Sequence, residues 1–175
     1  MVTAILMIVA MIGLPAFFNA LRRATVETWV TQVAAEARAA RLDAVKGSVR
    51  IYLQADLAGR RVVLFRETEV TPGFDVDTDE QVREIALPPR GLEFWGPHDV
   101  GPAGPDATSN LPSDRHLTFR PDGTTDVAGA IRFGDGRGNF LALSVGPIAT
   151  GRVQILKWDQ TSASWLPKSE WKWSS

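Results

Sequence analysis

The chain has 175 residues, of which 45% are hydrophobic and 22% are charged, so intrinsic disorder over most of its length is excluded. Its 19 Lys and Arg residues are balanced by 20 Asp and Glu residues, and the net charge of −1 argues against a surface built as a whole to bind nucleic acid. Cys is absent, which excludes disulfides, thiolate metal sites and cysteine nucleophiles.

The chain begins with an apolar run, MVTAILMIVAMIGLPAFF, in which Thr3 is the single polar side chain. A helix that crosses a bilayer needs about 17–25 such residues. A cleaved secretory signal carries basic residues before its apolar part, whereas here the first basic pair, Arg22 and Arg23, follows the run. We therefore predict a retained transmembrane helix over residues 1–20, with a cleaved signal and a buried core helix as the alternatives.

The helical pattern continues as an amphipathic segment over residues 21–47. This segment contains neither Gly nor Pro before Gly47, and its apolar residues form one stripe that Trp29 and Leu42 are expected to widen. The stripe predicts that the segment covers the core of a head domain. Its residues recur at spacings of three and four: Val26, Val30, Val33, Ala37, Ala40 and Ala44.

Two positions are expected to shape this long helix. Gly47 is the expected C-terminal stop, and Lys46 in the last turn suits the helix dipole. Pro15 is expected to kink the helix, because proline removes a backbone hydrogen bond, and Gly13 loosens the same turn.

From Ser48 onward the apolar period switches to two, which is typical of strands with one buried face. The run RVVLFR at residues 61–66 predicts a more fully buried strand. The stretch 96–112 is rich in Pro and Gly and is expected to be the most mobile loop of the head. The predicted strands are residues 49–54, 61–66, 82–87, 92–95, 116–120, 128–133, 139–145 and 152–158.

These elements predict an α+β fold, in which a long N-terminal helix, part membrane spine and part amphipathic, packs on an antiparallel β-sandwich head. The β-rich head covers residues 48–160. The tail, residues 161–175, contains Trp165, Trp171 and Trp173, and the pattern assigns it no position in the fold.

An acidic run could in principle supply oxygen ligands to calcium, because its carboxylates alternate along the chain. Asp75, Asp77, Asp79 and Glu80 form this run, but Glu80 stands where a calcium-binding helix-loop-helix needs Gly, and Ala86 stands where it needs a bidentate Glu. We interpret the run as a solvated loop, with an irregular calcium site as the alternative.

The two histidines, His98 and His116, are interpreted as structural or exposed, because no nucleophilic serine or second histidine at helical spacing accompanies them. The Gly-rich stretch 134–138 joins two strands, so it is interpreted as a hairpin turn and not as a phosphate loop. No constellation of residues assigns catalytic roles. We therefore expect neither an enzyme nor a cofactor, metal or small-molecule substrate.

The C-terminal quarter of the chain carries an excess of basic residues with Trp neighbours. Arg137, Arg152 and Lys157 are the candidate contacts to DNA, because cations and aromatic rings together bind nucleic-acid strands. The alternative interpretation is a solvated sheet edge with the Trp residues packed in the core.

Three stretches of the chain follow one another in a specific order. The first is VTAILMIVAMIGLPAF running into the long helix, with Pro15 inside it. The second is Ala40-Arg41 followed by Asp43-Ala44, an ARxxA-like stretch that leads from the helix to the first strand. The third is LTFRPDG, then FLALSV, then GRVQI. In this order they resemble the type IV pilin-like proteins, and within these the GspH/FimT-type pseudopilins.

The resemblance implies a structural role, as a minor pseudopilin of the type II secretion filament, which exports proteins across the outer membrane. It implies contacts with other pseudopilin subunits and with the lipid bilayer. It also implies a single-pass protein of the bacterial inner membrane with a GspH-like head in the periplasm. The residues of the membrane and filament spine would be Ile5, Leu6, Ile8, Val9, Ile12, Gly13, Leu14 and Pro15.

The resemblance leaves two other functions open. One is a FimT-like minor pilin that binds DNA in natural competence. DNA-binding members of that branch carry a second Arg two residues after the Gly-Arg pair, where this chain has Gln154, so DNA binding is not favoured. The other is a membrane-anchored periplasmic domain that does not assemble.

Overall fold

The computed structural model describes residues 2–68, 73–88, 91–94, 96 and 116–171, with side chains from residue 17 onward. Within these residues one long helix, α1 (Val2–Gly47), precedes all of the strands. The strands are β1 (Ile51–Asp56), β2 (Arg61–Arg66), β3 (Glu80–Ala86), β4 (His116–Phe119), β5 (Gly129–Gly134), β6 (Phe140–Val145), β7 (Val153–Asp159) and β8 (Ser164–Pro167), and a short 3-10 helix, η1 (Lys168–Glu170), follows them.

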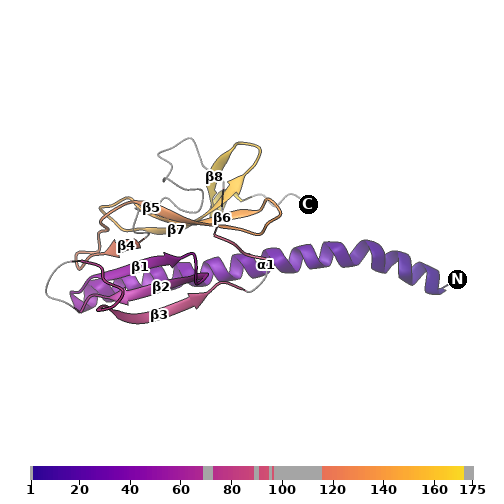
Figure 1. Cartoon of the computed structure of the whole chain (residues 1–175). Helices are drawn as coiled ribbons and strands as arrows, with labels where there is room; N and C mark the ends of the chain where they lie inside the picture. Colours follow the sequence, from indigo (N-terminus) through magenta and orange to yellow (C-terminus); the bar gives the residue numbers. More distant parts are fainter. Residues whose placement is uncertain (1, 69–72, 89–90, 95, 97–115, 172–175) are drawn as a thin grey trace.

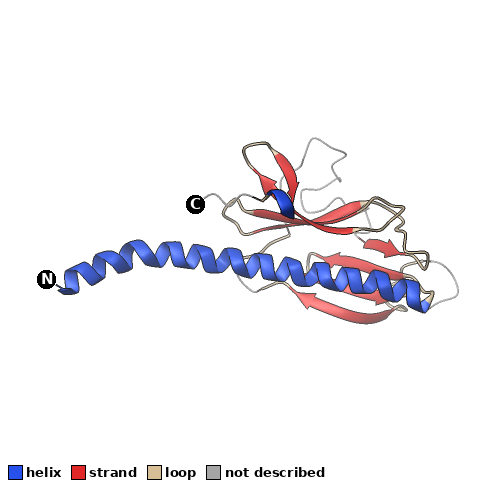
Figure 2. Cartoon of the chain, turned by 180° about the vertical axis from the view of Figure 1, so that it is seen from behind, coloured by secondary structure: helices blue, strands red, loops and turns tan. Residues whose placement is uncertain are grey.

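The strands form two antiparallel sheets (Figure 1). The order of the first sheet is β3-β2-β1-β4 and that of the second is β5-β6-β7-β8. Helix α1 contacts β1 and β4 of the first sheet and β6 and β7 of the second. Seen from behind, the C-terminal half of α1 crosses the first sheet, while its N-terminal half projects beyond both sheets (Figure 2). This arrangement confirms the predicted α+β fold, with a long helix packed on antiparallel sheets.

The C-terminal half of α1 is part of the hydrophobic core, as its apolar stripe predicts. All six stripe residues are buried, and Trp29 is buried with them. The Trp29 ring packs edge-on against Phe133, with centroids 5.0 Å apart, and its Nε1 donates to the carbonyl of Ala86 at 2.8 Å. Leu42 does not widen the stripe, since it is 53% exposed. At about 100° per residue it lies about 200° from Ala40, on the opposite face of the helix.

The C-terminal end of α1 is closed by Ser48 and not by a glycine in the left-handed region. Gly47 is the last helical residue, and Ser48 adopts a φ of 53°. The N–H of Val49 then donates to the carbonyl of Ala44 at 3.2 Å. This six-to-one bond is the Schellman arrangement, so the predicted stop is shifted by one residue toward the sheet.

One continuous core joins the helix to both sheets. Residues of β1 and β4 pack there against residues of β5 and β6, such as Ile131 and Leu143, which are fully buried. The second face of the first sheet is also covered: Tyr52, Val63 and Phe65 form a separate buried cluster. β2 is therefore buried on both faces, as predicted, whereas the prediction of one buried face for the first strand is wrong at Tyr52.

The predicted strands are confirmed as β1 to β7 with small shifts at their ends, except for the one expected at 92–95. There the described residues form only an isolated bridge, in which Glu93 and Gly134 exchange backbone hydrogen bonds of 2.8 Å. Trp95 and all but the first residue of the expected mobile loop, 96–112, lie outside the described residues.

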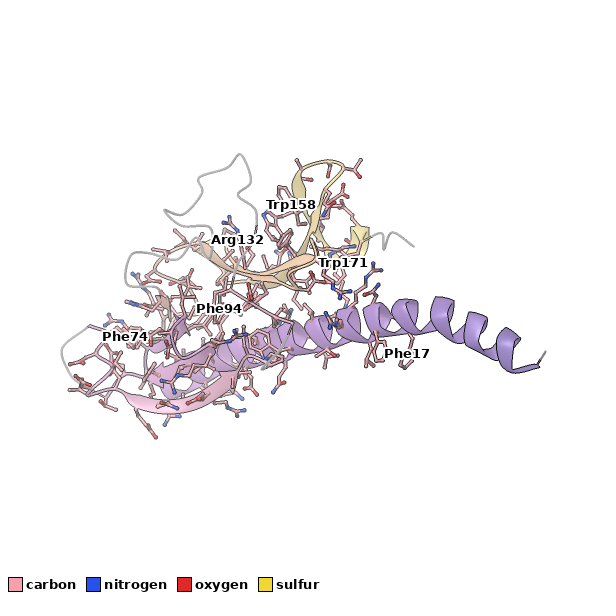
Figure 3. All side chains as sticks on the ribbon, turned by 45° about the vertical axis from the view of Figure 1, so that its right-hand side comes forward. Phe17, Phe74, Phe94, Arg132, Trp158 and Trp171 are labelled. Atoms are coloured by element: carbon pink, nitrogen blue, oxygen red, sulfur yellow. The ribbon has the colours of Figure 1, made fainter. Side chains whose placement is uncertain are left out.

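The Trp-rich tail extends the second sheet. β8 pairs with β7, which places Trp165 opposite Trp158 with ring centroids 5.4 Å apart. Trp171 donates from Nε1 to the carbonyl of Leu166 at 3.0 Å and packs against the main core. Figure 3 shows Trp158 and Trp171 on this part of the molecule, and Trp173 lies outside the described residues.

Candidate functional site

The residues expected to form the spine lie in the N-terminal half of α1. This helix runs without a break through Pro15, but the side chains before residue 17 lie outside the description. Among the described residues, no helix has a stretch long and apolar enough to cross a membrane. The transmembrane assignment of residues 1–20 stays a prediction.

The first described side chains of this part of α1 are apolar and exposed. Phe17, Phe18 and Leu21 are each more than half exposed. Figure 3 shows Phe17 on the part of the helix that projects beyond the sheets. These residues place three large apolar side chains on one exposed segment of the helix.

The three candidate DNA contacts do not form one patch. Arg152 directly precedes β7, and Lys157 lies near its end. Five residues of extended chain separate them by about 17 Å, and an odd number of steps places their side chains on opposite faces of the sheet. Arg137 lies in the turn between β5 and β6, where its Nη1 donates to Oδ1 of Asn19 on α1.

Arg137 and Lys157 instead lie near two arginines of α1, and we call this surface the basic groove. Its main hollow has a volume of about 250 Å³, and an adjoining hollow shares residues with it and reaches Lys157. Arg22 and Arg137 are exposed, and Arg23 is half-buried. The main hollow is lined by Asn19, Arg22, Arg23, Asp135, Arg137 and Asn139.

Burial lowers the pKa of Lys157, and the positive charge of Arg23 lowers it further, while Asp159 and Glu27 act in the opposite direction. Arg23 of the helix and Lys157 of the sheet line the same adjoining hollow, so cations of the two elements share one environment. This grouping was not predicted from the sequence, where Arg22 and Arg23 stand out only as the flank of the apolar run. No spacing along the chain relates them to residue 137.

Two of the three stretches that carry the pilin resemblance, the ARxxA-like stretch and the C-terminal one, meet at one place, which we call the helix–sheet junction. Arg41 donates from Nε to the carbonyl of Gly123 at 2.9 Å, and Arg38 donates from Nη2 to the carbonyl of Val153 at 3.3 Å. Gly151 has a φ of 52°, and a Cβ on it would lie 2.9 Å from the same Gly123 carbonyl. The junction therefore fixes the C-terminal half of α1 to β7 and to the connection between the two sheets.

The acidic run turns out to stabilise its own loop. Asp79, expected to be solvated, is 8% exposed, and its carboxylate accepts a hydrogen bond from the N–H of Asp75 at 3.1 Å. Asp75 in turn accepts one from the N–H of Asp77, and Glu80 pairs with Arg66 at 3.1 Å. In the described part of the chain, no three His, Asp or Glu side chains are grouped to hold a metal.

His116 packs among aromatic rings on the outer face of the first sheet. Its ring lies 4.7 Å from that of Phe74 and 5.7 Å from that of Tyr52, measured between centroids. Burial raises the pKa of Tyr52 to about 12, and its hydrogen bond to Glu67 adds to the effect. These contacts are structural, as interpreted for His116. His98 lies outside the described residues.

The fold thus defines an α+β protein whose single described long helix projects beyond two antiparallel sheets. No protein-family model and no curated protein matches this chain. Among solved structures, the chain is similar to the minor pseudopilin EpsH from the type 2 secretion system of Vibrio cholerae, with 13% sequence identity and a TM-score of 0.39. The match covers 85% of this chain and 99% of that chain. At these values it does not place the chain in a family.

Proposed function

We propose that this protein is a membrane-anchored minor pseudopilin, a structural subunit of a type II secretion filament. The observation that carries the proposal is the continuity of α1, whose sequence changes from an apolar run to an amphipathic stripe within one 46-residue helix. The apolar half of such a helix can lie in lipid or against neighbouring spines. The amphipathic half packs against the head of the same subunit.

The attachment of the head to the helix supports this role. The six stripe residues are buried in the core, and the helix–sheet junction adds hydrogen bonds from Arg38 to β7 of the second sheet and from Arg41 to Gly123 in the β4–β5 connection. A filament subunit transmits the position of its spine to its head, and this requires a rigid connection between the two. The proposal places the head in the periplasm and the apolar half of α1 in the inner membrane.

A matched pair of Ile→Lys variants tests the proposal in the source bacterium. Deleting the gene is expected to reduce export of type II substrates, and the full chain is expected to restore it. Ile8→Lys should fail to restore export and should weaken retention in the membrane after alkaline extraction, because a Lys at the centre of a membrane helix costs about 3 kcal/mol. Ile148→Lys, at a 49% exposed head position, should restore both.

Two results would contradict this function. One is normal export in the deletion strain combined with loss of DNA uptake, which would favour a competence pilin. The other is full restoration of export by Ile8→Lys.

DNA binding is expected to be weak, because the structure separates Arg152 from Arg137 and Lys157. At most the four cations of the basic groove can neutralise phosphates together, so the dissociation constant of the full chain for a labelled duplex should be about 10⁻⁴ M or weaker at physiological salt. Titrations at two salt concentrations in uncharged detergent measure this. Arg152→Ala should behave like the control Arg120→Ala, and micromolar binding that Arg152→Ala abolishes would instead support a DNA-uptake pilin.

A further inference from the structure

The basic groove presents the donors that bind phosphate oxygens. Each guanidinium carries five N–H groups in a planar fork that matches two phosphate oxygens. Arg22 and Arg137 approach the same hollow from α1 and from the β5–β6 turn, and the bond from Arg137 to Asn19 holds the turn against the helix. The groove is therefore assembled before a ligand arrives.

The carboxylates near the groove are engaged in other interactions. Asp135 is 8% exposed, and its oxygens accept hydrogen bonds from the N–H of Arg137 at 2.8 Å and from Asn139. Glu27 pairs with Lys168 at 3.1 Å, and Asp159 accepts two hydrogen bonds from Ser162. The exposed arginines Arg22 and Arg137 thus give the mouth of the groove a positive charge.

The position of the groove along α1 corresponds to the headgroup layer of a bilayer. The apolar run ends at Phe18, and at 1.5 Å per residue Arg22 lies about 6 Å beyond it. The polar layer on each side of the hydrocarbon core is about 5–8 Å thick. With Phe17 and Phe18 at the edge of the hydrocarbon, Arg22 and its neighbours would stand level with lipid phosphates.

We propose that the basic groove binds the phosphate of an anionic phospholipid headgroup and so sets the height of the head above the membrane. This inference rests on the proposed membrane anchoring of residues 1–20. An anionic headgroup is favoured over a zwitterionic one because its phosphate charge is not cancelled within the same molecule. It is favoured over a free phosphate ion because the anchor holds the groove at a surface where anionic lipid is concentrated.

Lipid affinity of the full chain in uncharged detergent micelles tests the proposal. Energy transfer from the Trp residues to a tail-labelled phosphatidylglycerol reports binding, and unlabelled lipids compete. Phosphatidylglycerol is expected to compete better than phosphatidylcholine. Each basic residue near a membrane surface contributes about 5-fold, so Arg22→Gln/Arg137→Gln should weaken binding about 25-fold. Arg22→Lys/Arg137→Lys keeps both charges and should retain most of the affinity.

The matched control is Arg120→Gln/Arg152→Gln, which removes two exposed arginines outside the groove and should leave the affinity unchanged. An unchanged thermal midpoint in all double variants shows that they are folded. Equal competition by the two lipids, or equal losses in the groove and control variants, would overturn the proposal. So would stronger competition by inorganic phosphate or by a DNA duplex. Alkaline extraction tests the membrane anchor separately. Normal export combined with no lipid preference would reject phospholipid binding by the basic groove and would leave the proposed function standing.

Discussion

Val33→Asp is expected to remove most of the stability of the head. Val33 is fully buried in the core between α1 and the sheets. An unpaired carboxylate at this depth loses its hydration without gaining a partner, and the expected loss is about 3–5 kcal/mol. Urea unfolding of the full chain in uncharged detergent, followed by tryptophan fluorescence, measures it.

The control for this variant is Leu42→Asp, nine residues further along the same helix. Leu42 is 53% exposed, so the same carboxylate there stays hydrated and should change the free energy of unfolding by less than about 0.5 kcal/mol. Similar losses in the two variants would mean that helix propensity and not burial governs the effect. An unchanged midpoint in Val33→Asp would mean that this face of α1 is not part of the core.

Gly151→Ala is expected to cost about 2–4 kcal/mol. Gly151 has a φ of 52°, where an L-residue with a side chain is strained by about 1–2 kcal/mol. Its added methyl would also lie 2.9 Å from the carbonyl of Gly123 and 3.1 Å from Cγ2 of Thr125. Relieving this overlap displaces the carbonyl that accepts the hydrogen bond from Arg41, so the helix–sheet junction loosens.

Gly136→Ala separates the backbone strain at positive φ from the steric overlap of the added methyl group. Gly136 has a φ of 69°, but a Cβ there would meet no atom within 4 Å. This variant should therefore lose only the backbone term of about 1–2 kcal/mol. Urea unfolding curves of Gly151→Ala and Gly136→Ala, measured as for Val33→Asp, give the difference between their losses in the free energy of unfolding. If the two losses are equal, the close approach of Gly151 to Gly123 makes no contribution to stability.

Much of the fold follows from local patterns in the sequence. The three- and four-residue spacing of the stripe identifies the buried face of α1, and the alternation and short apolar runs after Ser48 identify β1 to β7. The exposure of Leu42 also follows from helix geometry, although the residue was predicted to widen the stripe. The burial of Tyr52 depends on Phe74, which comes from a distant loop, so alternation alone does not predict it.

The candidate sites depend on tertiary structure to a greater degree. The sequence determined that Arg22 and Arg23 follow an apolar run, that Arg152 follows a glycine, and that Arg41 belongs to an ARxxA-like stretch. Only the folded chain decided which of these charges act together. The extended conformation of β7 separates Lys157 from Arg152, which directly precedes the strand, and packing of α1 on the second sheet joins residues more than 100 positions apart. Periodicity reports which side of an element is buried, whereas the partners across an interface are chosen by the packing of whole elements.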